Sequence, residues 1–267
     1  MITFVTCWYE LHSKYNKESY LLWIDNFLSN IKKCRLVIFT NKHSLSMVKK
    51  YESSNIKIII RELEDFHNYK YKDDWIKNHE KNDLLKDKTC WELNMLWNEK
   101  THFVEDVYKN NIFDTKWYGW CDIGYFRGRH CDMNIDLIKS WPNYKKLDEL
   151  DTEKVHYGNV NGDMQKTYRI YKQIMVKNSE DLPTIPIPPN EIFIAAGFFL
   201  ICKDNISWWN KTHNDKLKLY FEHDYLVKDD QMIVLDNIVS NLKKVKIHTE
   251  FSEGKYDNWF MFQRLLM

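Results

Sequence analysis

The chain has 267 residues, of which 44% are hydrophobic and 15% aromatic, and this composition is too apolar for a disordered segment. Its 39 Lys and Arg residues nearly balance its 38 Asp and Glu residues, so the formal net charge is only +1. A chain with so little net charge has no bulk field with which to hold a polyanion, and nucleic acid is therefore disfavoured as its main partner.

The first residues, the apolar runs and the cysteines indicate where in the cell the chain is expected. Residues 1–9 are apolar but carry no basic leader, and we interpret them as a strand and not as a secretory signal. No apolar run approaches the roughly 18 residues that a membrane span requires. The six cysteines are scattered and include no C-x-x-C pair. We therefore expect no membrane span and a reducing, cytoplasmic location.

The first part of the chain alternates predicted strands and helices. Apolar runs predict strands at 2–8, 36–40 and 56–60. Between them, apolar residues recur with helical spacing over 20–31, and a shorter helix is expected over 44–51. Nearly continuous apolar strands that alternate with helices are typical of a parallel sheet covered on both faces.

From residue 62 onward the pattern is less regular. Residues 62–88 and 130–190 show no clean period, and we interpret them as loops with short or broken helices, the second of which ends in an extended proline-rich stretch. The other predicted elements are helix 89–110, strand 117–121, strand 192–202, helix 208–225, helix 230–242 and strand 245–248. We predict a single α/β domain over residues 1–267 with a Rossmann-like, mixed, mostly parallel central sheet flanked by helices.

One candidate site residue stands at the end of a buried strand. Asp122 follows strand 117–121, and Gly124 comes two residues later. In open α/β sheets ligands bind at the carboxyl ends of the strands, so Asp122 should lie beside a ligand. A carboxylate there can hold Mg²⁺ or Mn²⁺ against a diphosphate, and Gly124 would let the backbone approach the phosphates. The alternative is that Asp122 merely caps a turn before Gly124.

Two later segments add to this candidate site. Ala196 and Gly197 interrupt a strand, and small residues in mid-strand mark a close approach of the backbone to a ligand or to another element. Asp229, Asp230 and Gln231 open a predicted helix, where an Asp is also an ordinary N-cap. The order of a strand-end Asp, a small-residue strand and an Asp-Asp-Gln helix start is more specific than any one of the three.

These segments resemble the HtrL/YibB (WlaTC/HtrL) proteins, which are small bacterial and giant-virus proteins placed in the GT-A nucleotide-sugar transferase superfamily. The resemblance covers essentially the whole chain, and the motif order is also similar to that of glycogenin-like transferases. The stretches that carry it are Ile2–Tyr9, Trp117–Arg129, Ala195–Cys202, Leu226–Gln231 and Asp257–Leu265.

The resemblance implies a fold and an activity. It implies the GT-A fold, with residues 1–129 as the nucleotide-binding half and residues 130–267 as the acceptor and sugar half with a C-terminal tail. The implied reaction is metal-dependent transfer of a sugar from a nucleotide-diphosphate donor, with a UDP-sugar favoured, to a hydroxyl of a glycan, lipopolysaccharide-type or protein-linked acceptor. The glycogenin-like motif order favours retention at the sugar. For a viral protein the location would be the host cytoplasm or the virion.

The resemblance also assigns roles to particular residues. Asp122 would contact the metal and the ribose. Asp230 and Gln231, with Asp229 before them, would lie beside the donor sugar, and Ala196 and Gly197 would line the sugar pocket. Asp230 would be the base that takes the acceptor proton if transfer inverts the sugar, and would position the sugar if transfer retains it.

Further ligands of the metal are less well defined by the pattern. The family pattern has a second Asp where this chain has Gly124. His248, at the end of the last predicted strand, would complete a Mn²⁺ or Mg²⁺ site with Asp122, and Asp257 is its competitor. The alternative for His248 is an exposed histidine on an edge strand.

Other donor contacts are predicted from position. Lys100 precedes the Asp122 strand and would either pair with a phosphate or lie on the surface. Arg127 and Arg129 follow that strand and would face the diphosphate or the acceptor. Thr6 and Tyr9 lie at the carboxyl end of the first strand, where such folds hold base and ribose. Tyr9 would either stack on uracil or pack in the core.

Two rival functions remain. The first is a glycan- or nucleotide-sugar-binding protein on a degenerate transferase fold, with Gly124 as the lesion. The second is a nucleotidyltransferase, which is disfavoured because residues 9–14 contain no Gly for a phosphate loop.

Overall fold

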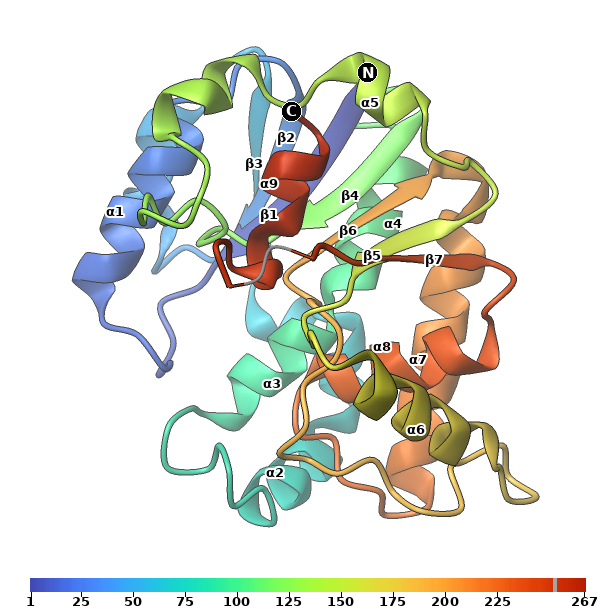
Figure 1. Cartoon of the computed structure of the whole chain (residues 1–267). Coiled ribbons are helices and arrows are strands. Elements are labelled where there is room, and N and C mark those ends of the chain that lie inside the picture. The colour runs from blue at the N-terminus through green and yellow to red at the C-terminus, as the bar shows by residue number, and fades with distance from the viewer. Residues whose placement is uncertain (252–253) are drawn as a thin grey trace.

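A seven-stranded sheet organises the chain (Figure 1). The computed structural model describes residues 1–251 and 254–267, and the strand order in these residues is β3-β2-β1-β4-β6-β5-β7. The strands are β1 (Ile2–Trp8), β2 (Arg35–Thr40), β3 (Ile56–Ile60), β4 (Trp117–Cys121), β5 (Val155–Gly158), β6 (Phe198–Cys202) and β7 (Val245–His248).

The sheet is mixed but mostly parallel. β1 pairs in parallel with β2 and β4, and β2 with β3. β6 runs antiparallel to both of its neighbours, β4 and β5, whereas β5 and β7 are parallel. Among the described strands β6 alone therefore runs against the others. The predicted mixed, mostly parallel α/β sheet is confirmed.

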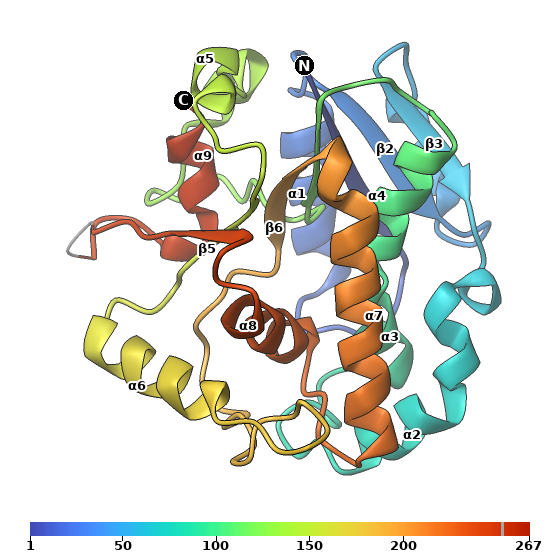
Figure 2. The same cartoon turned by 90° about the vertical axis from the view of Figure 1, so that its right-hand side faces the viewer.

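Helices cover both faces of the sheet (Figures 1 and 2). One face carries α1 (Lys17–Leu28), α5 (Tyr144–Asp148) and α9 (Met261–Leu265). The other carries α3 (Trp91–Asn98), α4 (Lys100–Lys109), α6 (Met164–Met175), α7 (Ile206–Glu222) and α8 (Asp230–Ser240), with α4 and α7 side by side, and α2 (Lys72–Glu80) next to α3. The 3₁₀ helices are Leu45–Met47, Lys49–Tyr51, Leu63–Asp65, His67–Tyr71, Ile135–Ser140, Lys203–Asn205 and Asn258–Phe260.

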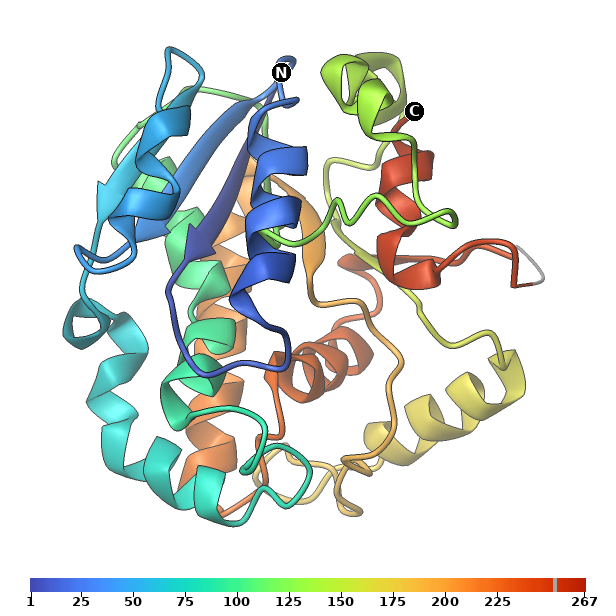
Figure 3. The same cartoon turned by 90° about the vertical axis from the view of Figure 1, so that its left-hand side faces the viewer.

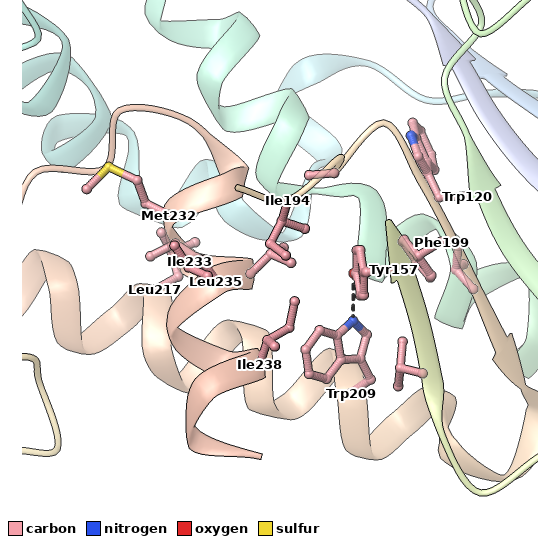
Figure 4. Close-up of a cluster of buried hydrophobic side chains, with 14 of the residues drawn as sticks. Trp120, Tyr157, Ile194, Phe199, Trp209, Leu217, Met232, Ile233, Leu235 and Ile238 are labelled. Atoms are coloured by element: carbon pink, nitrogen blue, oxygen red, sulfur yellow. Dashed lines mark hydrogen bonds between the residues drawn. The ribbon is translucent and has the colours of Figure 1, made fainter. Parts of the chain in front are cut away.

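Alternate side chains of β1 enter two separate cores. Phe4 belongs to the core under α1, whereas Val5 belongs to the core under α4, because successive side chains of a strand point to opposite faces. In the second core Trp209 donates from Nε1 to the hydroxyl of Tyr157 at 3.0 Å (Figure 4). This bond satisfies two polar groups inside an apolar cluster, which would be costly to bury without partners.

The predicted helix over 89–110 is broken, and this prediction was wrong in its continuity. Glu99 stands between α3 and α4, and its carboxylate accepts backbone N–H bonds from His67 at 2.7 Å and from Asn68 at 3.1 Å. Burial raises the pKa of Glu99 to about 8 despite these two bonds. The break places Lys100 in the first turn of α4, where its side chain reaches the end of the sheet.

Other differences from the sequence predictions are local. Residues 44–51 form two 3₁₀ turns in place of one helix. The strand expected over 192–202 is ordered as a strand only over Phe198–Cys202, because the chain turns at Ala195–Gly197. Residues 130–190 contain β5 and the twelve-residue α6, which the irregular pattern did not predict. None of the helices in the described part of the chain combines the length and apolar character that crossing a bilayer needs.

Candidate active site

A pocket of about 440 Å³ opens at the carboxyl ends of β1 and β4. This volume lies within the ~300–1,000 Å³ that is usual for small-ligand sites. Its walls come from the chain after β1, α1, α3, the β4 end, the turn before β6, the start of α8 and the chain before α9. Figure 3 shows α1, α3, the start of α8 and the chain into α9 on this side of the molecule. The pocket lies where parallel α/β sheets bind ligands.

Lys100 lies at the centre of the charged wall. Its Nζ is 3.2 Å from Oδ1 of Asp122 and 2.8 Å from Oδ2 of Asp230. It also donates to the carbonyl oxygen of Ala196 at 3.1 Å. Since both carboxylate oxygens touch one nitrogen, they are at most about 6 Å apart. The structure thus brings together Asp122 and Asp230, which are distant in the sequence. The lysine between them is buried, so the alternative of a surface lysine is wrong.

Burial and ion pairing set the charges of this group. Burial opposes the charge of Lys100, but the adjacent Asp122 and Asp230 outweigh it and raise the pKa of the ammonium. Burial is also the main reason why the pKa of Asp230 rises to about 6, with Lys100 opposing and Asp229 adding to the rise. At neutral pH Asp230 is therefore mainly ionised beside a protonated lysine.

Asp122 is the carboxylate of this group that faces the open pocket. Its side chain is 44% exposed, whereas that of Asp230 is 7% exposed. Trp120 donates from Nε1 to Oδ1 of Asp122 at 2.6 Å, and the Asp122 backbone N–H donates to Gly197 at 2.9 Å. A Cβ at Gly197 would lie 2.8 Å from Oδ2 of Asp122. The small residue before β6 is therefore required by the Asp122 carboxylate.

The two neighbours of Asp230 differ in role. Asp229 is the N-cap of α8, accepting from the Gln231 backbone N–H at 3.2 Å, and its Oδ2 lies 3.1 Å from Nζ of Lys228. Gln231 lines the pocket, and its buried Oε1 has no hydrogen-bond partner among the described residues. Asp229 thus has the capping contact that the structural alternative predicted, whereas Gln231 has an acceptor to offer a ligand.

Trp23 leaves no room for a side chain at position 124. A Cβ on Gly124 would lie 2.8 Å from Cε3 of the Trp23 indole. The position where the family pattern has a second Asp is therefore closed by an aromatic ring of α1. The structure thus gives a packing reason for the glycine, and since Gly124 also lines the pocket, its approach to phosphates stays a prediction.

Arg127 is held by aromatic rings. Its guanidinium carbon lies 4.4 Å from the Trp23 ring centroid, 4.9 Å from that of Tyr15 and 5.1 Å from that of Phe260. Its Nε donates to the carbonyl of Gly124 and its Nη1 to the hydroxyl of Tyr15, both at 3.2 Å. Cation–π contacts fix a cation without neutralising its charge. Arg127 lines the pocket, where that charge can meet an anion.

The first strand contributes less than expected. Tyr9 lines the pocket, but it is 6% exposed, its ring meets Phe66 edge-on at 5.3 Å and its hydroxyl donates to the Arg61 carbonyl at 3.0 Å. This is the core packing that was the alternative to base stacking. Thr6 is fully buried and is absent from the pocket wall formed by the described residues.

His248 lies away from Asp122. It ends β7, which is separated from β4 by β6 and β5, and three strand spacings correspond to roughly 14 Å. Its Nε2 is 2.9 Å from Nδ1 of His156. Burial lowers the pKa of His248 to about 4, with His156 adding to the effect. The predicted metal pair of Asp122 and His248 is therefore not brought together.

The competing third ligand, Asp257, does line the pocket. Its Oδ2 accepts from Nη2 of Arg129 at 2.8 Å, and its Oδ1 accepts from the Trp259 backbone N–H at 3.0 Å. Both oxygens are thus engaged. Among the residues that the structure describes, no three His, Cys, Asp or Glu side chains are grouped as metal ligands. The donor set, with Lys100 against Asp122 and both Asp257 oxygens in use, does not fit a protein-held divalent ion.

The sequence reasoning missed several pocket residues. Lys14 and Tyr15 lie in the loop after β1, and Lys14 stands 5.1 Å from the ring centroid of Trp97. The strand-end rule that selected Tyr9 would also have selected this loop. Trp23 and Trp97 lie on helices, and their periodicity does not distinguish a pocket wall from a core face.

Comparisons with known proteins add little to this geometry. No protein-family model matches the chain, and no curated protein sequence matches it. Among solved structures it is similar to the galactosyltransferase LgtC in complex with donor and acceptor sugar analogues, with TM-score 0.49, 12% identity, and coverage of 97% of this chain and 83% of that chain. So distant a similarity establishes neither a family nor an activity, and the resemblance to the HtrL/YibB proteins stays a prediction.

Proposed function

We propose that the chain is a glycosyltransferase of the GT-A type. It would move a sugar from a nucleotide-diphosphate donor, with a UDP-sugar favoured, to a hydroxyl of a glycan, lipopolysaccharide-type or protein-linked acceptor. The observation that carries the proposal is the Asp122–Lys100–Asp230 group, assembled from three segments at the carboxyl ends of the strands. The motif resemblance to the HtrL/YibB proteins supports the same assignment.

The proposal places the donor along the pocket. Base and ribose would lie near Tyr9 and Trp97, the diphosphate near Arg127, and the sugar near Gly197 and Gln231. The supporting contacts are the pocket wall shared by these residues, the ring-held guanidinium of Arg127 and the free Oε1 of Gln231. Residues 1–129 would then hold the nucleotide and residues 130–267 the sugar and acceptor within one domain.

The proposed chemistry uses Asp230 and Lys100. The bond from the sugar anomeric carbon to the diphosphate oxygen breaks, its electron pair stays on the diphosphate, and the acceptor oxygen bonds to the anomeric carbon. If the centre inverts, Asp230 takes the acceptor proton, for which its pKa of about 6 is suited. If it is retained, which the motif order favours, the leaving phosphate takes that proton and Asp230 positions the sugar. In either case Lys100 fixes the carboxylate.

The cysteines are consistent with the proposed cytoplasmic location. All six are free, and Cys7, Cys34, Cys121 and Cys202 are buried. Burial raises the pKa of the Cys7, Cys34 and Cys121 thiols, so these thiols are protonated and unreactive at neutral pH.

The function is tested by donor binding and turnover. We expect one class among UDP-, GDP- and CMP-sugars to raise the thermal midpoint of the full chain, since a ligand that binds only the native state stabilises it. The same donor should be hydrolysed slowly or transferred to an added glycan, with release of the nucleotide. Binding of glycans without any nucleotide response would instead support the degenerate binding protein, and no response to any donor would contradict the proposal.

A further inference from the structure

Each carboxylate on the pocket wall is already paired with a cation of the chain. In the described part of the wall these carboxylates are Asp122, Asp229, Asp230 and Asp257. A Lys or Arg nitrogen lies within 3.2 Å of every one of them: Lys100 for Asp122 and Asp230, Lys228 for Asp229, and Arg129 for Asp257. Every acid of the pocket thus has a cation of the protein beside it, and Asp122 and Asp230 share one.

The positions that would supply further ligands to a divalent ion at Asp122 are closed or distant. The Trp23 indole closes the position of a second carboxylate at Gly124. His156 holds the candidate histidine, His248, three strands away from Asp122. Lys100 stands against Asp122 itself, and a divalent ion bound to the same oxygen would be repelled by this ammonium.

Two cations of the wall have no carboxylate partner within 4 Å among the described residues, and these are Arg127 and Lys14. Arg127 is stacked among three rings, and Lys14 stands over the Trp97 ring. Rings fix these cations but leave their charge available to a ligand. They therefore supply two positive charges to an anion that enters the pocket, and a diphosphate carries two negative charges as its donor ester.

We infer that this pocket counters the donor diphosphate with the side chains of Arg127 and Lys14 and does not recruit a divalent metal. The inference rests on the proposed function, and it replaces the Mn²⁺ or Mg²⁺ expected from the family resemblance. When the bond between the sugar and the diphosphate breaks, its electron pair moves onto the phosphate oxygen. The planar guanidinium of Arg127 can meet that oxygen with two N–H donors, and no further co-reactant is needed.

Metal binding is tested first, on the full chain without nucleotide. Mn²⁺ alone is titrated, and the free ion is followed by electron paramagnetic resonance. We expect the wild-type chain to leave the Mn²⁺ signal unchanged. In Lys100→Gln two carboxylates at most about 6 Å apart lose their ammonium, and we expect Mn²⁺ to bind this variant at least about tenfold more tightly than the wild type. Lys109→Gln, on the exposed side of the same helix, is the charge-matched control. Tight Mn²⁺ binding by the wild type would overturn the inference.

Nucleotide binding is tested second, with UDP and GDP as probes. We expect the affinity for whichever binds to be the same, within about twofold, in EDTA, Mg²⁺ and Mn²⁺, whereas Arg127→Gln weakens it about tenfold or more and Lys14→Gln about threefold. Lys109→Gln should bind like the wild type. A gain of more than about tenfold on adding Mg²⁺ or Mn²⁺ would overturn the inference. If neither diphosphate binds under any condition, the proposed function fails, and the Mn²⁺ titration still decides the metal question.

Discussion

The two ends of the pocket hold their charges in different ways. At one end Lys100 is 8% exposed and Asp230 7% exposed, and each is held by an opposite charge. At the other end Arg127 is partly exposed and is held by the rings of Tyr15, Trp23 and Phe260. A buried ion pair fixes geometry, and removing one partner leaves a charge buried without compensation. A ring-held cation keeps its charge for a ligand. We expect substitutions at the Lys100 end to lower both the unfolding free energy and the activity. Substitutions at the Arg127 end should mainly weaken donor binding.

The largest effect is expected from Lys100→Met. This change leaves Asp122 and Asp230 without their shared ammonium, and breaking such a buried pair destabilises a fold by ~3–5 kcal/mol. Transfer should fall by at least about 10³-fold, since the acids are no longer held. Urea unfolding and kcat/KM measure the two effects. Lys109→Met is the control on the same helix, and a Lys100→Met variant of wild-type stability would remove the contrast between the two ends.

Asp122→Asn should affect activity more than stability. The substituted amide can still accept from Trp120, and the side chain is nearly half exposed, so the loss of stability should be clearly smaller than that of Lys100→Met. The rate of sugar transfer should fall by about 10²–10³-fold, because the pocket loses the charge of a carboxylate that lines it. Asp136→Asn, which is exposed, is the matched control for kcat/KM and for unfolding. Unchanged turnover in a folded Asp122→Asn variant would refute the site.

The acid limb of the pH profile should report Asp230. Burial raises the pKa of this carboxyl from its usual range to about 6, so it is protonated below pH 6 and ionised above it. If the ionised form is the active one, kcat/KM should fall about tenfold per pH unit below pH 6 and be flat above it. Measuring kcat/KM from pH 4.5 to 8 tests this. A limb centred near pH 4 would mean that Asp230 keeps an ordinary pKa or does not act in the reaction.

At the ring-held end, Tyr15→Ala should cause a modest loss of donor affinity. The Tyr15 ring is one of three around Arg127, and the Tyr15 hydroxyl accepts a hydrogen bond from this arginine. A partly exposed cation–π contact contributes ~0.5–1 kcal/mol. We expect a loss of affinity of about fivefold and little change in unfolding free energy. Tyr15→Phe keeps the ring and separates its share from that of the hydroxyl. A loss of unfolding free energy as large as that of Lys100→Met would show that the two ends do not differ in their contribution to stability.

The smallest effect is expected from His248→Ala. Its imidazole contacts His156 on the neighbouring strand and does not line the pocket. We expect kcat/KM to change less than about twofold. Tyr225→Phe, at another residue that is not among those lining the pocket, is a suitable reference. A loss of about 10²-fold or more in His248→Ala would restore this histidine as a ligand and contradict the observed placement.

The sequence predicted the acids of the site better than what lies between them. Asp122 and Asp230 were found because strand ends and helix starts are local signals that meet at one edge of a parallel sheet. The position of Lys100 depends on the break at Glu99, which is bonded to the backbone of His67 and Asn68 about 30 residues earlier. Helical periodicity contains no trace of such a contact, and no Gly or Pro marks the break.

Arg127 was predicted as a pocket residue, but the rings that hold it were missed for a related reason. Gly124 is conspicuous in the sequence, but its partner Trp23 belongs to an ordinary amphipathic helix face about 100 residues away. The same holds for β5, whose four residues include a polar histidine and a glycine and so lack a strand pattern. Features that depend on a distant partner, such as this glycine and the break at Glu99, were not predicted.

The reversed direction of β6 has a consequence for how such a protein can diversify. Because β6 runs against β4, its first residue is next to the last residue of β4, and the chain that enters β6 at Gly197 reaches the pocket. The chain leaves β6 at the other end of the strand, away from the pocket, and continues into α7. A change in the turn before Phe198 would therefore alter what is presented to the pocket, while Phe193 and Ile194 just before that turn stay in the core.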